Sequence, residues 1–323
     1  MKTLGNKTDL KGEMNSNDKG VGSEIASVII ISYNNLQYLN ESIDSVLSQN
    51  YPSIELIVSD DGTPDFPKEE IEQYIKAHAN SNIVNVIVTT NETNSGIVKN
   101  VNKGISLSNG GYIKVLASDD KLYGENALSK YVSSFNENKE YDVFFSDAVI
   151  VYPDGKIEKH SNHRIAKNLK TSDEFFARLC QSNFFVAGTS CFRKSFFKKY
   201  GLFDERFFLL EDWPMWLKAA RLGCKFGFIE EALFEYRASI GCSSASAKNP
   251  KFENDVENCY KYCVLPFLNQ IDKRSRMAAL DSYFEKCVHP KGRIQEAVFL
   301  AEKPHYCAFK IKRKLRMKLS LRF

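Results

Sequence analysis

Apolar residues in the first part of the chain alternate between short continuous runs and longer segments with helical spacing. The short runs are rich in β-branched residues and predict four buried strands, at Ser27–Ser32, Ile54–Ser59, Ile83–Val88 and Tyr112–Leu116. The longer segments predict helices at Leu36–Gln49, Pro67–His78 and Ile97–Leu107. Strands that are apolar throughout and alternate with helices are typical of a parallel sheet covered on both faces. The predicted fold class is therefore α/β, with a mostly parallel central sheet.

The pattern changes twice further along the chain. In the middle, strand and helix signals are mixed, with strands predicted at Val143–Val151, Cys224–Phe228 and Ala232–Tyr236 and helices at Ser172–Cys180 and Pro214–Leu222. Beyond Asn249 only helical signals remain. The sequence predicts a disordered leader over residues 1–24, an α/β domain over 25–246 with halves at 25–120 and 121–246, and a C-terminal helical region over 247–323.

The end of the chain differs in charge from the rest. Residues 303–323 contain eight Lys and Arg residues and no acidic residue, whereas the remainder contains 36 basic and 40 acidic residues. A near-neutral body with a basic tail favours contact of the tail with an anionic surface, not a body that binds nucleic acid. A frayed, solvated tail is the alternative. No apolar run approaches the ~18 residues of a membrane-spanning helix.

Two features narrow the compartment and the class of protein. The eight cysteines are scattered, and the polar start lacks the apolar segment of a secretory signal, so we expect reduced thiols in a cytoplasmic protein. The turn after the first predicted strand, Ser32–Asn35, lacks the glycines of a G-x-G-x-x-G motif. This argues against a dinucleotide-binding dehydrogenase.

Two acidic pairs follow predicted strands. Asp60 and Asp61 come after the second strand, and Asp119 and Asp120 come after the fourth. The carboxyl ends of parallel strands share one edge, so these pairs are expected to be neighbours in space. Carboxylates gathered in this way suit a divalent cation, Mg²⁺ or Mn²⁺, that holds a diphosphate. The alternative is that each pair only caps a helix or forms a turn.

A third acidic site lies just before a predicted helix, at Glu211 and Asp212. Asp212 precedes Pro214 by two positions and fits a helix N-cap, which is a purely structural role. The functional interpretation is a carboxylate that takes a proton. Trp213 offers an apolar platform for a sugar ring, whereas Trp216 is expected to pack in the core.

Four stretches together resemble the family-2 glycosyltransferases, which have the GT-A fold. Ser27–Asp65 resembles the opening of that family, and Asn94–Asp120 resembles the stretch that contains its acidic metal-binding motif. Leu210–Gly223 is similar to the E-D-x-x-x-W-L block, and Leu233–Ser246 to the closing Y-R segment. The resemblance covers about two thirds of the chain, in the right order, and points to the enzymes of bacterial surface-polysaccharide synthesis.

The resemblance assigns residues to a nucleotide-sugar donor, most simply a UDP-sugar. It implies that Tyr33 stacks on the base with Ser32 beside it, and that Asp61 accepts the uracil N–H with Asp60 as its neighbour. A carboxylate only accepts hydrogen bonds, which suits an edge that presents an N–H. Asp119 would then approach the ribose. The last residue of this pair, Asp120, would hold Mn²⁺ or Mg²⁺, which neutralises the leaving diphosphate.

The same resemblance implies that Asp212 is the general base of one inverting displacement, with Glu211 placing the acceptor hydroxyl of a glycan or lipid-linked glycan. Arg237 would steady the diphosphate; the alternative is an ion pair of Arg237 with Glu235 or Glu231. The chain departs from the family where many relatives have a histidine two residues after the Y-R pair. Either water or a serine, Ser239 or Ser243, completes the metal shell there, or metal binding is weak.

Three functions account for these features to different extents. A metal-dependent glycosyltransferase at the cytoplasmic membrane face explains all three acidic sites. A catalytically silent nucleotide-sugar-binding scaffold of a polysaccharide complex would explain the missing histidine, but it does not need Asp61, Asp120 and Asp212 together. A nucleotidyltransferase would need a glycine-rich basic loop after the first strand, and the sequence contains none.

Overall fold

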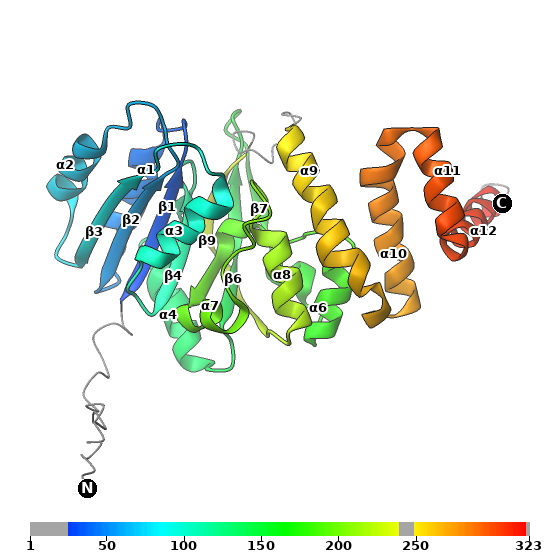
Figure 1. Ribbon diagram of the computed structural model, residues 1–323. Coiled ribbons are helices and arrows are strands. Elements are labelled where there is room, and N and C mark those ends of the chain that lie inside the picture. Colours follow the sequence, from blue (N-terminus) through cyan, green and yellow to red (C-terminus); the bar gives the residue numbers. More distant parts are fainter. Residues whose placement is uncertain (1–24, 239–248, 321–323) are drawn as a thin grey trace, which may run out of the picture.

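A computed structural model describes residues 25–238 and 249–320 (Figure 1). Its centre is a mixed sheet of nine strands in the order β3-β2-β1-β4-β8-β6-β9-β5, with β7 paired to β6. The strands are β1 (Ala26–Ser32), β2 (Ile54–Asp60), β3 (Ile83–Thr90), β4 (Tyr112–Ala117), β5 (Lys121–Leu122), β6 (Val143–Val151), β7 (Ile157–His160), β8 (Ser190–Arg193) and β9 (Phe226–Arg237). β1 to β4 pair in parallel, and so do β6 and β9, whereas β5, β7 and β8 pair antiparallel with their neighbours.

Helices cover both faces of the sheet. They are α1 (Leu39–Leu47), α2 (Lys68–His78), α3 (Ile97–Leu107), α4 (Ala127–Glu137), α5 (Asn162–Ala166), α6 (Ser172–Leu179), α7 (Lys194–Tyr200) and α8 (Asp212–Arg221), with a 3₁₀ turn η1 (Ala187–Thr189) before β8. Alternate side chains of β1 point to opposite faces. Val28 and Ile30 pack with α1, α2 and α4, whereas Ile29 packs with α3 and α8. The sheet is therefore buried on both sides at β1, β2 and β4, which explains their unbroken apolar runs, whereas the edge strand β3, predicted to be buried, is largely exposed.

The strand register brings distant turns together. Ser32 at the end of β1 is level with Asp60 at the end of β2, and Ile31 is level with Ala117 at the end of β4. The end of β9, Arg237, also lies there, because its backbone N–H bonds to Asp120. The turns after β1, β2 and β4 thus share one edge, as the sequence predicts.

The C-terminal region consists of helices, as predicted. They are α9 (Pro250–Cys259) with the π and 3₁₀ turns η2 (Tyr260–Val264) and η3 (Leu265–Gln270), α10 (Lys273–Tyr283) with η4 (Phe284–Val288) and η5 (His289–Lys291), α11 (Arg293–Glu302) and α12 (Pro304–Ser320). Cys259, Tyr260 and Val264 belong to the main core, whereas Phe284 and Tyr306 belong to a separate cluster. Figure 1 shows α10 to α12 extending away from the sheet, while α9 lies beside α8.

Several expectations change in detail. The two strands predicted at 224–228 and 232–236 form one strand, β9, whose pairing with β6 shifts register between Ser146 and Ala148. Strands β5, β7 and β8 and helices α4 and α7 were not predicted. The seven described cysteines are free thiols. Within the described ranges, no helix is long and apolar enough to cross a membrane. The leader predicted over residues 1–24 lies outside the described residues.

The tail is not frayed in its described part. Tyr306 of α12 is buried at 1% exposure and its hydroxyl donates to Asp281 on α10. Lys310 bonds to Glu285 at 2.9 Å, and Arg313 bonds to Asp281. Two of the tail cations are therefore paired with acids of the preceding helices.

Candidate active site

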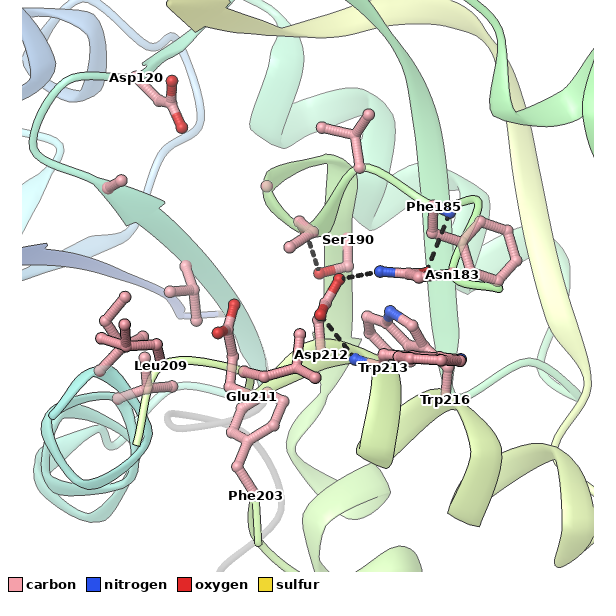
Figure 2. A pocket seen from close by; sticks show the side chains of 18 of the residues that line it. Asp120, Asn183, Phe185, Ser190, Phe203, Leu209, Glu211, Asp212, Trp213 and Trp216 are labelled. Carbon is pink, nitrogen blue, oxygen red and sulfur yellow. Dashed lines mark hydrogen bonds between the residues drawn. The ribbon is translucent and has the colours of Figure 1, made fainter. Parts of the chain in front are cut away.

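A cavity of about 510 Å³ lies where the carboxyl ends of β1, β4 and β9 meet the start of α8. Four carboxylates line it, Asp119, Asp120, Glu211 and Asp212. Figure 2 shows Asp120 on one side of the cavity and Glu211 and Asp212 on another. The edge formed by the carboxyl ends of parallel strands is where ligands bind in open α/β sheets. The second and third acidic sites of the sequence are thus brought to one cavity.

Asp119 and Asp120 are poorly neutralised. Asp120 is 7% exposed, and burial together with the charge of Asp119 raises its pKa well above the ordinary value. Burial also raises the pKa of Asp119. The compensation comes from the Arg237 backbone N–H, which donates to Asp120 at 3.1 Å, and from the charges of Arg237 and Lys114, although burial lowers the pKa of Lys114 to about 8. Two buried carboxylates with this little compensation favour a bound cation.

The donor chemistry of this pair fits a divalent ion that arrives with a diphosphate. Mg²⁺ and Mn²⁺ commonly use one or two protein carboxylates and take their remaining ligands from phosphate oxygens and water. Within the described part of the chain, no three His, Cys, Asp or Glu side chains gather as a complete metal site. The serines offered in place of the missing histidine, Ser239 and Ser243, lie outside the described residues.

Asp60 and Asp61 have a different environment. Asp60 is fully buried and accepts five hydrogen bonds, from Ser32, Gly62, Thr63 twice and Thr90. Asp61 accepts four, three at Oδ1 and one at Oδ2, from Asn91, Ser95 twice and Gly96. Neither aspartate lines the cavity, although Ile97, the next residue after Gly96, does. Asp60 therefore holds the turn, and only Oδ2 of Asp61 keeps accepting capacity.

Ser32, the last residue of β1, and Tyr33, the residue after it, also differ in role. Ser32 is 5% exposed and its hydroxyl donates to Asp60 at 2.9 Å. Tyr33 is 42% exposed, which leaves its ring available for a ligand. The sequence assigned both to the nucleotide, and the structure places Tyr33 at the surface and Ser32 inside the turn.

Asp212 is the first residue of α8 and not its cap. Glu211 occupies the N-cap position, and no side chain caps this end. The N-cap interpretation of Asp212 is therefore wrong. Its carboxylate instead accepts from Asn183 Nδ2 at Oδ2 and from the Trp213 backbone N–H at Oδ1, both at 2.6 Å (Figure 2).

Glu211 and Asp212, at the start of α8, differ in how readily they ionise. Burial and the charge of Asp212 raise the pKa of Glu211 to about 8. Burial also raises the pKa of Asp212, but the hydrogen bonds from Asn183 and Trp213 lower it. Donors to a carboxylate stabilise its ionised form, so Asp212 is the member that ionises first. At neutral pH Glu211 keeps the proton.

Asn183 is part of the site, although no pattern in the sequence points to it. It lies between α6 and η1, and its own Oδ1 accepts from the Phe185 backbone N–H at 3.2 Å, which fixes the amide orientation.

Trp216 is 1% exposed and packs in the core, as expected. Trp213 lines the cavity, but its indole N–H donates to Leu179 at 2.9 Å and only 2% of the residue is exposed.

Arg237 pairs with a residue that the sequence did not suggest. Its guanidinium bonds to Glu41 at 2.8 Å and lies 3.9 Å from the ring centroid of Tyr38. The proposed alternative partners are engaged elsewhere, Glu235 with Lys121 and Glu231 with Lys130. Arg237 therefore stays beside the Asp119–Asp120 turn, where Nε also donates to the Asp119 carbonyl at 3.2 Å.

Solved structures share the fold. S. aureus TarS 1–349 in complex with UDP-GlcNAc matches with a TM-score of 0.55 at 17% identity, covering 81% of this chain and 80% of that one. The mannosyltransferase PcManGT from Pyrobaculum calidifontis, in complex with GDP-Man and Mn²⁺, matches with a TM-score of 0.56 at 13% identity, covering 90% and 82%.

Relatives are also found by sequence. An uncharacterized glycosyltransferase of Haemophilus influenzae is 26% identical over 257 residues, which is 76% of this chain and 75% of the relative. The minor teichoic acid biosynthesis protein GgaB of Bacillus subtilis is 27% identical over 68% of this chain, but over only 23% of GgaB. The model of glycosyl transferase family 2 matches residues 27–201, more than half of the chain. The chain therefore belongs to glycosyl transferase family 2.

Proposed function

We propose that this glycosyltransferase moves a sugar from a UDP-sugar to a hydroxyl of a glycan or lipid-linked glycan acceptor, with inversion, during surface-polysaccharide synthesis at the cytoplasmic face of the membrane. The similarity to a teichoic acid protein supports the class of acceptor, and the UDP-GlcNAc complex of TarS supports the donor. The free cysteines are consistent with a reducing compartment.

The observation that carries the proposal is the pairing of two unlike carboxylate sites in one cavity. Mn²⁺ or Mg²⁺, when bound at Asp120 with Asp119 beside it, would supply charge neutralisation for the diphosphate. Arg237 lies next to this turn and adds a fixed positive charge. Tyr33 and Oδ2 of Asp61 would receive the base at the neighbouring turn.

The second site would handle the acceptor proton. Asp212 ionises before Glu211, so its carboxylate takes the proton of the acceptor hydroxyl as that oxygen attacks the anomeric carbon from the side opposite the diphosphate. A positioned base of this kind typically contributes ~10²–10⁴-fold. Glu211 keeps its proton and can donate a hydrogen bond that orients the acceptor. Asn183 holds the Asp212 carboxylate in place.

Asp212→Asn tests this assignment. The Asn variant should lose at least about a hundredfold in transfer while its affinity for UDP stays within about twofold, because the base takes no part in donor binding. Transfer is measured as product formed from UDP-GlcNAc and UDP binding by calorimetry, with Asp173→Asn, exposed on α6, as the control. Near-normal turnover in Asp212→Asn would assign the base to another residue. If the wild type binds UDP but turns over no nucleotide-sugar, the silent scaffold is the better description.

We further propose that the tail cations other than Lys310 and Arg313 contact an anionic membrane surface. Lys312 of α12 is exposed, unlike Lys310. Each basic residue near such a surface contributes ~1 kcal/mol, and the attraction weakens with salt. Sedimentation with anionic and neutral vesicles measures it. Equal binding to both kinds of vesicle would contradict the proposal.

A further inference from the structure

One cation lines the acceptor side of the cavity and a second lies close behind its lining. Lys286 on η4 lines the same cavity as the four carboxylates, and its Nζ lies 5.9 Å from the ring centroid of Trp213. Arg178 on α6 lies 4.9 Å from the ring centroid of Phe184, the residue between Asn183 and Phe185. Lys286 thus lies over the ring next to Asp212 in the chain, and Arg178 over the ring next to Asn183, which bonds to Asp212.

These cations lack an acidic partner within the described ranges. Neither Lys286 nor Arg178 forms an ion pair there, although Arg178 donates to the Ser182 hydroxyl at 3.3 Å. Other cations of the same helices do pair, such as Lys291 with Glu257 and Lys310 with Glu285. Partial burial lowers the pKa of Lys286, and the nearby charge of Arg178 lowers it further. Two neighbouring cations that form no ion pair among the described residues favour an anionic ligand.

We infer that Lys286 and Arg178 form a subsite for an anionic group, a phosphate or a carboxylate, carried by the acceptor. This inference rests on the proposed function, because it takes the acceptor hydroxyl to bind at Asp212. Trp213 follows Asp212 in the chain and its ring lies below Lys286. An anionic group a short distance from the reacting hydroxyl therefore reaches the cations. The acceptor class is a polyol phosphate or an acidic sugar.

Ligand binding in this cavity can be measured by intrinsic fluorescence, since the chain has two tryptophans and both line the cavity. The full chain, held with saturating UDP and Mn²⁺ to occupy the diphosphate side, is titrated with glycerol 3-phosphate, glucuronate and glycerol. We expect glycerol 3-phosphate or glucuronate to bind at least about tenfold more tightly than glycerol, and to weaken with salt. The preferred anion identifies the phosphate or the carboxylate source.

Two variants locate the subsite. Lys286→Gln and Arg178→Gln should each reduce the affinity for the preferred anion by about tenfold, the change expected for one lost charge-assisted contact. Lys291→Gln, which removes an exposed and paired cation nearby, should leave it unchanged. Equal binding of anions and glycerol by the wild type, or unchanged affinity in both variants, overturns the inference. UDP release from UDP-GlcNAc, measured in the same samples, tests the proposed function separately.

A different observation links α9 to catalysis. Asp255 on α9 is 2% exposed, and its Oδ2 accepts from three consecutive backbone N–H groups, those of Phe208, Leu209 and Leu210, at 2.8, 2.6 and 3.2 Å. These residues directly precede Glu211. A carboxylate that holds three successive N–H groups fixes the path of the chain into Glu211 and Asp212.

The other side of the same loop is also held. The Phe208 carbonyl accepts from Val98 N–H at 3.5 Å, and a Cβ on Gly96 would approach that carbonyl to 2.5 Å. Gly96 N–H in turn bonds to Asp61. The structure assigns to Asp255 the role of a positioning residue for the Asp212 base, so the C-terminal helix α9 is part of the catalytic unit.

Asp255→Ala and Asp255→Asn test this role. We expect Asp255→Ala to lower kcat for transfer by about 10–100-fold with the Kd of UDP unchanged, and Asp255→Asn, whose amide oxygen still accepts, to recover part of kcat. The pH at which activity rises should also move, since Asp212 is displaced from Asn183. Glu253→Gln, exposed on the same helix, is the control. Unchanged kcat in a folded Asp255→Ala protein, or equal loss of kcat and UDP affinity, would overturn the assignment.

Discussion

The Asp60–Asp61 turn and the Glu211–Asp212 segment each place two adjacent carboxylates at a strand or helix end, yet their environments are opposite. Asp60 and Asp61 accept nine hydrogen bonds between them from neighbouring backbone N–H groups, hydroxyl groups and the Asn91 amide. The side chains of Glu211 and Asp212 accept far fewer, and burial raises the pKa of both.

This difference indicates a structural role for the first pair and a chemical role for the second. A carboxylate surrounded by donors builds a rigid turn, and most of its lone pairs are already occupied. A buried carboxylate with few donors costs stability and gains a pKa closer to neutral, where a general base works best. The Asp119–Asp120 pair resembles the second kind, and a divalent cation would relieve its cost.

The largest expected effect is that of Asp120→Ala on the binding of UDP. If Asp120 holds the cation that binds the diphosphate, the variant should lose at least about a hundredfold in UDP affinity with Mn²⁺. Calorimetric titration of UDP with and without Mn²⁺ measures this. Asp154→Ala, exposed in the hairpin between β6 and β7, serves as the control. An identical titration for wild type and Asp120→Ala would place the cation elsewhere.

Asn183→Ala tests whether donors set the basicity of Asp212. Losing the 2.6 Å hydrogen bond should raise the pKa of Asp212, because that bond stabilises the ionised form. The base must be deprotonated, so activity should rise at a higher pH than in the wild type, and transfer near neutrality should fall by about tenfold or more. Asn183→Asp adds a negative charge and should shift the profile further. The profile of kcat/KM across about pH 5 to 9 decides it, and a profile that does not move contradicts the role.

Much of the donor side could be predicted from the sequence, for physical reasons. Strands buried on both faces are apolar throughout, so β1, β2 and β4 stand out, and parallel pairing forces their ends to one edge. Ile97–Leu107 is a helix with the predicted bounds. The positions of Asp119 and Asp120 follow from these rules alone.

The acceptor side depends on contacts that leave no local pattern. Asn183 meets Asp212 across 29 positions, and Asp255 reaches the loop before Glu211 across 45 or more. Neither residue has a spacing or periodicity that marks it. The Glu41 partner of Arg237, 196 positions away, is likewise set by tertiary packing, which explains why the nearer Glu235 and Glu231 were wrong.

Glu211→Gln measures how much the Glu211–Asp212 pair lowers the stability of the folded chain. An unfolded glutamate ionises near pH ~4.3, whereas the pKa of Glu211 in the folded chain is about 8. Between these values the folded state keeps a proton that the unfolded state has lost, so wild-type stability falls as pH rises through this window. Glu211→Gln removes that loss and should be more stable than the wild type by about 4–5 kcal/mol at pH ~8, because each unit of pKa difference corresponds to ~1.4 kcal/mol, with no difference near pH ~4. Thermal unfolding compares the two, with the exposed Glu137→Gln as control. Equal stability at both pH values would contradict the raised pKa.

Tyr33→Ala is the mildest change and tests the donor turn from its exposed side. Its ring is 42% exposed while Ser32, next to it, is buried, so the tyrosine can be truncated without disturbing the turn that Asp60 holds. Stacking of an aromatic ring on a base contributes ~1–3 kcal/mol, and the low end of that range predicts about a five- to tenfold weaker Kd for UDP. Tyr33→Phe keeps the ring and should bind within about twofold of the wild type. If the Phe variant weakens as much as the Ala variant, the hydroxyl and not the ring contacts the ligand. If neither weakens, the base lies away from this turn, and the rigid architecture around Asp60 and Asp61 serves only the fold.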